Sequence, residues 1–175
     1  MPFKNSIIIL LAVLLGAGAV MAQKPYRIGT TAANFLEIGY GTAGSAMGDA
    51  YVSMARDLSA LYWNPAGLAD MQKNQALFVY QPWIAGIKTS FAGVGLNLHN
   101  YGTLSLGFTS VNYGDMKVTT MAMQEGTGEL FSASDMAFSL AYARKLTNWF
   151  SFGGAAKYIN SSIWHTDASA MAIDL

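Results

Sequence analysis

Large apolar residues alternate with small or polar ones through most of the second half of the chain. The clearest example is the stretch 136–143, which reads Met-Ala-Phe-Ser-Leu-Ala-Tyr-Ala. Alternation with a period of two predicts a β-strand whose two faces meet different surroundings. The pattern predicts six strands, at residues 75–81, 85–98, 102–113, 132–146, 149–160 and 168–175.

The composition of the two faces indicates the environment of this sheet. A soluble sandwich places large apolar residues inward and charged residues outward. Here the second face carries Gly, Ser, Ala, Thr and Asn, and charges are rare inside the strands. A transmembrane barrel instead presents large apolar residues to lipid and small or polar ones to its lumen. Several predicted strands also reach the 9–11 residues or so that a tilted strand needs to cross a bilayer. We therefore expect an all-β protein, a transmembrane antiparallel β-barrel.

The connections between the strands predict an orientation. Residues 99–102 and 147–149 are short links, whereas 114–131 and 161–167 are longer. Short turns of such barrels face the periplasm and long loops face outside, so the first strand is expected to rise from the periplasmic side. Aromatic residues near the strand ends fit an aromatic girdle, although each is also an ordinary strand-end residue. They are Trp83, Tyr101, Tyr113, Trp149 and Trp164.

Six strands are too few to close a barrel of this kind. Bacterial single-chain barrels start at eight strands, and an open edge in lipid leaves backbone groups unpaired. The last predicted strand also reaches the end of the sequence at Leu175. We expect the sequence to be the N-terminal part of a longer protein; the alternative is a barrel assembled from several copies.

The first 22 residues predict a signal peptide, and export follows from it. Lys4 precedes an apolar run at 7–20, and Val20-Met21-Ala22 offers small residues before a cleavage site. About 20 residues are needed for a spanning helix, so a short membrane anchor is the weaker interpretation. The expected organisation is a signal peptide at 1–22, an N-terminal segment at 23–74 and a strand region at 75–175.

Charge and cysteine content limit the partners. Only 11% of residues are charged, with 10 Lys plus Arg against 10 Asp plus Glu. This balance provides no basic surface for nucleic acid, which is not expected as a partner. The chain has no cysteine, which is compatible with export but does not establish it.

The run 57–69, Asp-Leu-Ser-Ala-Leu-Tyr-Trp-Asn-Pro-Ala-Gly-Leu-Ala, is apolar and yet resists any single regular element. Pro65 removes a backbone donor and keeps Asn64 out of the helical region. Asn64 is expected to form an Asx turn, and Gly67 to supply a positive φ. Because Leu58, Leu61 and Leu68 favour burial, the run needs a surrounding structure.

This run and the residues before it resemble a known family. The stretch 34–52, followed by 57–69, is similar to the PorV/PorQ family of FadL-like outer-membrane barrels. The similarity continues through Trp83-Ile-Ala-Gly86, Asn112-Tyr-Gly-Asp115, 131–135 and 141–146. The Tyr-Trp-Asn-Pro-Ala-Gly-Leu run is the most specific part of the resemblance.

The resemblance implies a barrel of about 14 strands whose N-terminal segment, 23–74, folds back into the lumen as a hatch. It also implies an outer-membrane location and contact with membrane lipid. The residues expected to form the hatch motif, in a structural or gating role, are Asp57, Leu61, Tyr62, Trp63, Asn64, Pro65, Ala66 and Gly67.

Other candidate sites are weaker. Residues 39–44 match G-x-G-x-x-G but lack the strand, helix and acidic residue of a dinucleotide site. His99 and His165 are unaccompanied by a ligand cluster, and no catalytic constellation is visible. We therefore expect no cofactor, no metal and no enzyme activity. Asp49 and Asp57 are expected to form structural ion pairs with Arg56 or Lys157, and a functional gate is the weaker alternative.

Two functions fit these expectations. The first is a secretion-associated role of the type IX kind, in which the barrel docks secretion-system components or cargo proteins. The second is passive transport of hydrophobic small molecules, in which hatch movement opens a path. The second predicts a pocket lined by Leu61, Tyr62 and Trp63.

Overall fold

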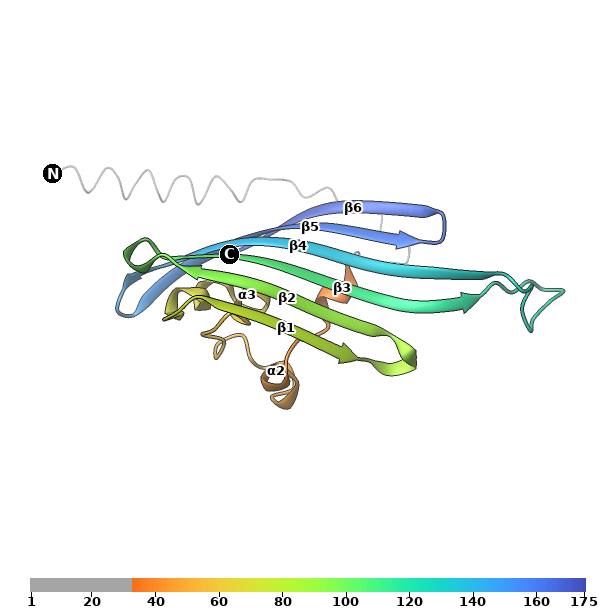
Figure 1. Ribbon diagram of the computed structural model, residues 1–175, viewed down its shortest axis with the longest axis horizontal. Coiled ribbons are helices and arrows are strands. Elements are labelled where there is room, and N and C mark those ends of the chain that lie inside the picture. Colours follow the sequence, from red (N-terminus) through yellow and green to blue (C-terminus); the bar gives the residue numbers. More distant parts are fainter. Residues whose placement is uncertain (1–32) are drawn as a thin grey trace, which may run out of the picture. The chain divides into compact units, whose positions relative to one another are not determined.

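The computed structural model describes residues 33–175, so the predicted signal peptide lies outside the described residues. Six strands form one antiparallel sheet in sequence order, each paired with its neighbours in the chain. This confirms the six predicted strands and their antiparallel pairing (Figure 1). The strands are β1 (Gln75–Pro82), β2 (Lys88–Asn97), β3 (Thr103–Lys117), β4 (Leu130–Thr147), β5 (Phe150–Ile163) and β6 (Thr166–Asp174).

The strand ends differ from the predicted ones where turns decide them. β2 begins only at Lys88, because Ala85 and Gly86 take positive φ values of 56° and 78° in the turn before it. The predicted long loop at 161–167 is wrong: β5 and β6 are joined by Trp164 and His165 alone. Residues 161–163 pair with residues 166–168, so both sides of the expected loop belong to strands. The chain reverses only at Trp164, which adopts a positive φ of 56°.

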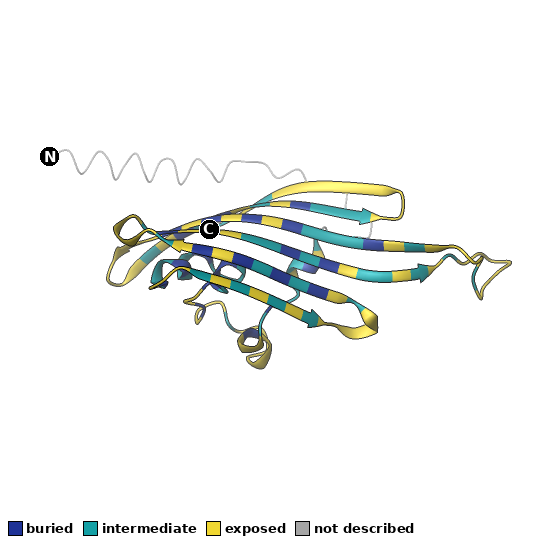
Figure 2. Cartoon of the chain, in the orientation of Figure 1, coloured by how far each residue is buried: buried dark blue, intermediate teal, exposed yellow. Residues whose placement is uncertain are grey.

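The two faces of the sheet differ as the alternation predicts. We call the face packed against residues 33–74 the covered face, and the opposite one the open face. On β4, Ala137, Ala141 and Ala143 are buried, while Phe138 and Leu140 between them are exposed. Figure 2 shows the same alternation of buried and exposed positions along β2, β3 and β4. On β4, small residues therefore line the covered face and large apolar residues line the open face; on β2, β3 and β5 the covered face also carries the large Phe91, Val111 and Ile159.

The N-terminal segment, by which we mean residues 33–74, consists of short helices and turns. The helices are η2 (Asn34–Glu37), α2 (Thr42–Ala46), α3 (Ala60–Trp63) and η3 (Pro65–Asp70). Two further 3-10 turns, η4 (Ile84–Gly86) and η5 (His99–Tyr101), connect strands. In the part of the chain that the structure describes, no helix is long and apolar enough to cross a membrane.

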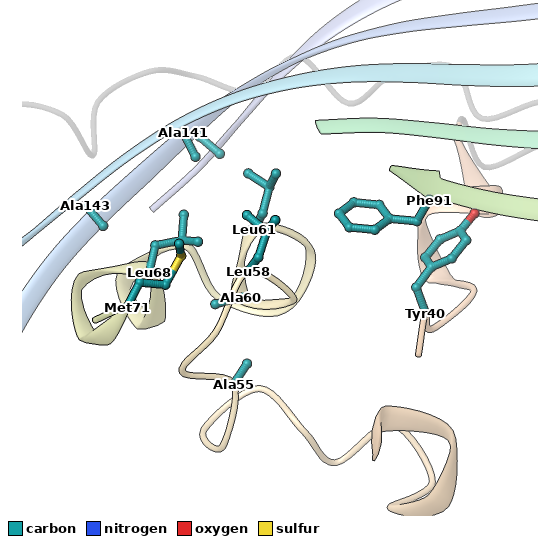
Figure 3. Close-up of a cluster of buried hydrophobic side chains, with 11 residues drawn as sticks. Tyr40, Ala55, Leu58, Ala60, Leu61, Leu68, Met71, Phe91, Ala141 and Ala143 are labelled. Atoms are coloured by element: carbon teal, nitrogen blue, oxygen red, sulfur yellow. The ribbon is translucent and has the colours of Figure 1, made fainter. Parts of the chain in front are cut away.

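The hydrophobic core lies between the N-terminal segment and the covered face. Leu58, Leu61 and Leu68 are almost fully buried there, as the sequence predicts (Figure 3). Burial of each such side chain contributes about 1.5–3 kcal/mol. A second cluster joins Phe35 to Val111 and Ile159 further along the sheet.

Both edges of the sheet are open in residues 33–175. β1 pairs only with β2, and β6 pairs only with β5. The described strands therefore form an open sheet, and barrel closure is not part of this structure.

Candidate functional site

The Asn64–Pro65 step divides the apolar run 57–69 into two helical pieces. α3 ends at Trp63, and Asn64 takes an extended conformation with φ −161°. Its Oδ1 accepts a hydrogen bond of 3.1 Å from the amide of Ala66, which confirms the expected Asx turn. Pro65 then opens η3, a position where its missing N–H costs nothing.

Gly67 is needed because there is no room for a side chain at this position, and not because of its backbone angle. The expected positive φ is wrong, because Gly67 is not among the positive-φ glycines of the described residues. A Cβ at this position would instead collide with the backbone carbonyl of Ala55. The glycine allows η3 to pack directly against the preceding turn.

Three glycines on the covered face receive the N-terminal segment. A Cβ on Gly95 would lie 2.7 Å from Met71 Cε, and one on Gly107 would lie 2.6 Å from Leu61 Cδ2. At Gly153 the contact is with backbone: a Cβ there would lie 2.5 Å from the amide nitrogen of Ala66. These approaches are far closer than the ordinary 3.5–4.0 Å or so between carbon atoms. The segment is therefore fitted into the wall at three separate strands.

Tyr62 and Trp63 hold the earlier part of the segment in place. The Tyr62 hydroxyl donates to the carbonyls of Leu36 at 2.6 Å and Ile38 at 2.9 Å. Trp63 Nε1 donates to the carbonyl of Tyr40 at 3.2 Å. Its ring lies against Gly39 and Gly44, where a side chain would clash. The G-x-G-x-x-G match thus accommodates an indole ring.

Tyr40 is the most unusual polar residue of this core. It is almost fully buried against Tyr62 and Phe91, with ring centroids 5.1 and 5.7 Å away. Its hydroxyl has no hydrogen-bond partner among the described residues. Burial raises the pKa of Tyr40 to about 12 and also raises the pKa of Tyr62, because each phenolate would lose its hydration.

The ion pairs differ from the expected ones. Lys145 on β4 donates to Asp70 at 2.9 Å, and Arg56 lies 4.0 Å from the same carboxylate. Lys157, whose side chain is only 10% exposed, pairs with Asp174 on β6. The expected pairs of Asp49 and Asp57 are therefore wrong. Asp57 instead accepts a hydrogen bond from the Ser59 amide at 2.9 Å, just before α3.

The open face presents an apolar band between charged ends. Along β4, the exposed Phe138, Leu140 and Tyr142 are followed by Arg144, also exposed. At the opposite end, Lys88 of β2 pairs with Asn112 of β3, which in turn pairs with Ser134 of β4, so the three residues lie in one row across the sheet. Ser134 and Arg144 are about ten residues apart, or roughly 34 Å along a strand. A tilt of about 40° reduces this to about 26 Å, close to the ~25 Å apolar band of outer-membrane barrels.

Four of the five expected girdle residues are exposed at the strand ends. Tyr101 and Trp149 are 75% and 85% exposed at one end, and Trp83 and Trp164 are exposed at the other. Tyr113 differs. It packs against the second core cluster, and its hydroxyl donates to Asp135 at 2.5 Å. The odd-numbered residues of β3 face the covered side, and the alternation in the sequence already places Tyr113 among them.

The described residues contain one hollow beside the expected motif. It has a volume of about 390 Å³ and lies between the N-terminal segment and the first two strands. Tyr40, Tyr51, Tyr62 and Phe91 contribute to its wall. Leu61 and Trp63, which the sequence placed in such a pocket, do not line it. Within residues 33–175, no group of three or more His, Asp or Glu side chains could hold a metal ion.

Comparison with protein families identifies the chain. A family model described as "Type IX secretion system protein PorV" matches residues 21–174, nearly the whole chain. The chain belongs to the PorV family. This confirms the family that the sequence motifs indicated. Proteins of the PorV family are outer-membrane components of the type IX secretion system and are not known as enzymes.

Searches among curated proteins and among solved structures gave no match. The family model spans both the N-terminal segment and all six strands. For a PorV-family protein, an open face of large apolar residues is the face that suits lipid. The glycine contacts and the Asp70–Lys145 pair escaped the sequence analysis, since nothing local indicated which small residue or charge would meet which.

Proposed function

We propose that this protein is an exported outer-membrane protein of type IX secretion whose barrel docks partner proteins. In this proposal residues 1–22 are a signal peptide, residues 23–74 are a lumenal hatch, and residues 75–175 are the first part of the barrel wall. Its partners are outer-membrane lipid and secretion components or cargo. The observation that carries it is the way the N-terminal segment is fitted into the wall.

A fixed hatch favours docking over transport. Backbone atoms of Pro65 and Ala66 lie directly over Gly153, so this contact has no flexible side chain that could swing aside. The Lys145–Asp70 ion pair joins the same part of the segment to β4. Moving such a segment requires the loss of several buried leucine contacts at about 1.5–3 kcal/mol each. A lumen closed in this way leaves the exterior of the barrel as the working surface.

The β3–β4 hairpin offers a surface for a partner. Its tip, residues 118–129, extends past the neighbouring turns (Figure 1). Val118 and Glu129 are joined by an amide-to-carbonyl bond of 2.9 Å, and Thr120 and Met123 exchange bonds of 3.2 and 3.1 Å. Met121 is 100% exposed and Met123 is 56% exposed on this tip. Exposed methionines are adaptable contact residues, which suits a surface that meets other proteins.

The test is site-specific cross-linking in cells that secrete by the type IX route. A photoreactive amino acid at Met121 is expected to yield an adduct with a secretion component or a cargo protein, identified by mass spectrometry. The same amino acid at Asn148, in the turn at the other end of the sheet, is the matched control. Equal adducts at both positions, or none at Met121, would contradict docking through the hairpin.

The hollow beside Tyr62 favours a second candidate, passive transport of a hydrophobic small molecule. Its six aromatic wall residues suit an apolar ligand of modest size. The test is uptake of a hydrophobic substrate by liposomes that contain the full-length protein. Uptake that Trp63→Ala abolishes would support transport, because Trp63 anchors this part of the segment; the absence of any uptake would reject it.

A further inference from the structure

The end of the sheet that carries Tyr101 and Trp149 is basic, and the other end is acidic. Arg56, Lys73, Arg144 and Lys145 lie in segments at the first end, where they outnumber the carboxylates Asp57 and Asp70. At the second end, Asp115, Glu125, Glu129 and Asp167 outnumber Lys88 and Lys117. Such a separation of charge indicates that the two ends meet different surroundings.

Arg144 stands apart from the other cations at its end. It continues the outward series of Phe138, Leu140 and Tyr142, and it pairs across the sheet with Phe152, another exposed aromatic residue. Among residues 33–175, no carboxylate lies within 4.0 Å of it, whereas its neighbour Lys145 points to the covered face and pairs with Asp70. Arg144 therefore carries an uncompensated positive charge on the apolar face.

The depth of Arg144 fits the headgroup layer. It ends the apolar band of about 26 Å, and Tyr101 and Trp149 are exposed at the same end of the sheet. An arginine that faces lipid is strongly unfavourable at the midplane of a bilayer and nearly neutral close to the interface. Aromatic belts mark the same level. An arginine at this depth meets lipid phosphates.

A notch next to Arg144 provides room and further polar groups. It lies between the turn 98–102 and the turn after β4, and it has a volume of about 340 Å³. Asn100, Arg144 and Asn148 contribute to its wall, so residues with amide donors accompany the arginine. Ala69, Thr103 and Lys145 contribute from the covered side, so the notch lies at the end of the sheet, where the two faces meet. The Cβ of Arg144 packs 3.2 Å from the position that a Cβ on Gly102 would take. The absence of a side chain at Gly102 leaves space for the base of the arginine.

We propose that this notch is a binding site for the phosphate group of a membrane phospholipid, with Arg144 as its principal ligand. The planar guanidinium presents parallel N–H donors that match two phosphate oxygens. The acyl chains of the same lipid then lie along Phe138, Leu140 and Tyr142. The inference rests on the outer-membrane placement under Proposed function, and it adds a defined lipid contact to it.

The test is native mass spectrometry of the full-length protein released from lipid nanodiscs. Wild type in phosphatidylglycerol is expected to retain one lipid more than Arg144→Gln, and in diacylglycerol, which lacks the phosphate, the difference should vanish. Lys73→Gln removes the same charge from the segment before β1 and should behave as wild type. Inorganic phosphate at millimolar concentration should leave the retained phospholipid in place, because the acyl chains contribute to its binding.

Several results would overturn the site. Equal retention by wild type and Arg144→Gln removes the role of the arginine, and equal retention of diacylglycerol removes the role of phosphate. Displacement by inorganic phosphate alone would show an anion site without lipid recognition. Failure of every variant to enter nanodiscs would instead reject the membrane placement and the site with it. Normal insertion without a lipid difference would reject the site alone.

Discussion

The closest contact between the N-terminal segment and the sheet gives the sharpest test of the fitted hatch. Replacing Gly153 by Ala adds a Cβ 2.5 Å from the amide nitrogen of Ala66 and 2.5 Å from the carbonyl carbon of Pro65. The contact falls about 1 Å short of ordinary carbon packing. Since both obstructing atoms are backbone, the segment 65–70 must shift as a unit. Overpacking of this kind costs about 1–3 kcal/mol.

Gly154 supplies the matched control. A Cβ there would meet Leu175 Cδ2 at 3.4 Å and the Asp174 carbonyl oxygen at 3.5 Å, which is ordinary contact. Gly154→Ala also restricts the unfolded chain, a change that stabilises proteins by about 0.4–1 kcal/mol. The two variants therefore have the same chemistry in adjacent positions and opposite expected effects.

The assay is trypsin cleavage of the N-terminal segment in the membrane-inserted, full-length protein. Arg56 and Lys73 are exposed cleavage positions, and cutting requires the segment around them to open. A penalty of about 2 kcal/mol raises the open population roughly 30-fold, and cleavage follows that population when reclosing is fast. Gly153→Ala should be cut about that much faster than wild type, and Gly154→Ala should not. Equal cleavage of all three proteins would refute the fitted hatch.

Three further predictions follow from single contacts. Leu61→Ala should lower the free energy of unfolding by about 2–5 kcal/mol in urea titrations followed by tryptophan fluorescence, because Leu61 is buried over Gly107. Leu130→Ala, at an exposed position, should change the free energy of unfolding by about 0.5 kcal/mol or less. Similar losses in the two variants would contradict the assigned core. Burial raises the pKa of Tyr40 from 10.0 to about 12, so the unfolded chain loses the phenolic proton at a lower pH than the folded protein does. The contribution of the neutral Tyr40 to folding stability is therefore complete below pH 10 and is lost as pH rises through 12. Tyr40→Phe should lose less stability than wild type between pH 9 and pH 12, and parallel losses would show that the hydroxyl is hydrated. Finally, a cysteine at Thr127 should react with a membrane-impermeant reagent on intact cells and one at Asn148 should not; the reverse result would invert the predicted orientation.

The strands illustrate what a local pattern can predict. Alternation along 136–143 depends only on neighbouring residues, so it predicted both the strand and the opposite character of its faces. The same parity indicates that Tyr113 belongs to the covered face, although its place near a strand end favoured the girdle. The turn at Trp164 and His165 escaped prediction, since a two-residue turn there depends on the pairing of β5 with β6.

The candidate site was predictable only in part. The sequence by itself determined that the helix must break at Asn64–Pro65, because proline chemistry acts on adjacent residues. It also determined that Leu58, Leu61 and Leu68 need a core. Only the tertiary structure decided that Gly153 receives the backbone of Ala66 and that Lys145 reaches Asp70, 75 positions away in the chain. Such contacts depend on the register of distant strands, which packing of the whole covered face selects, and no local pattern specifies them.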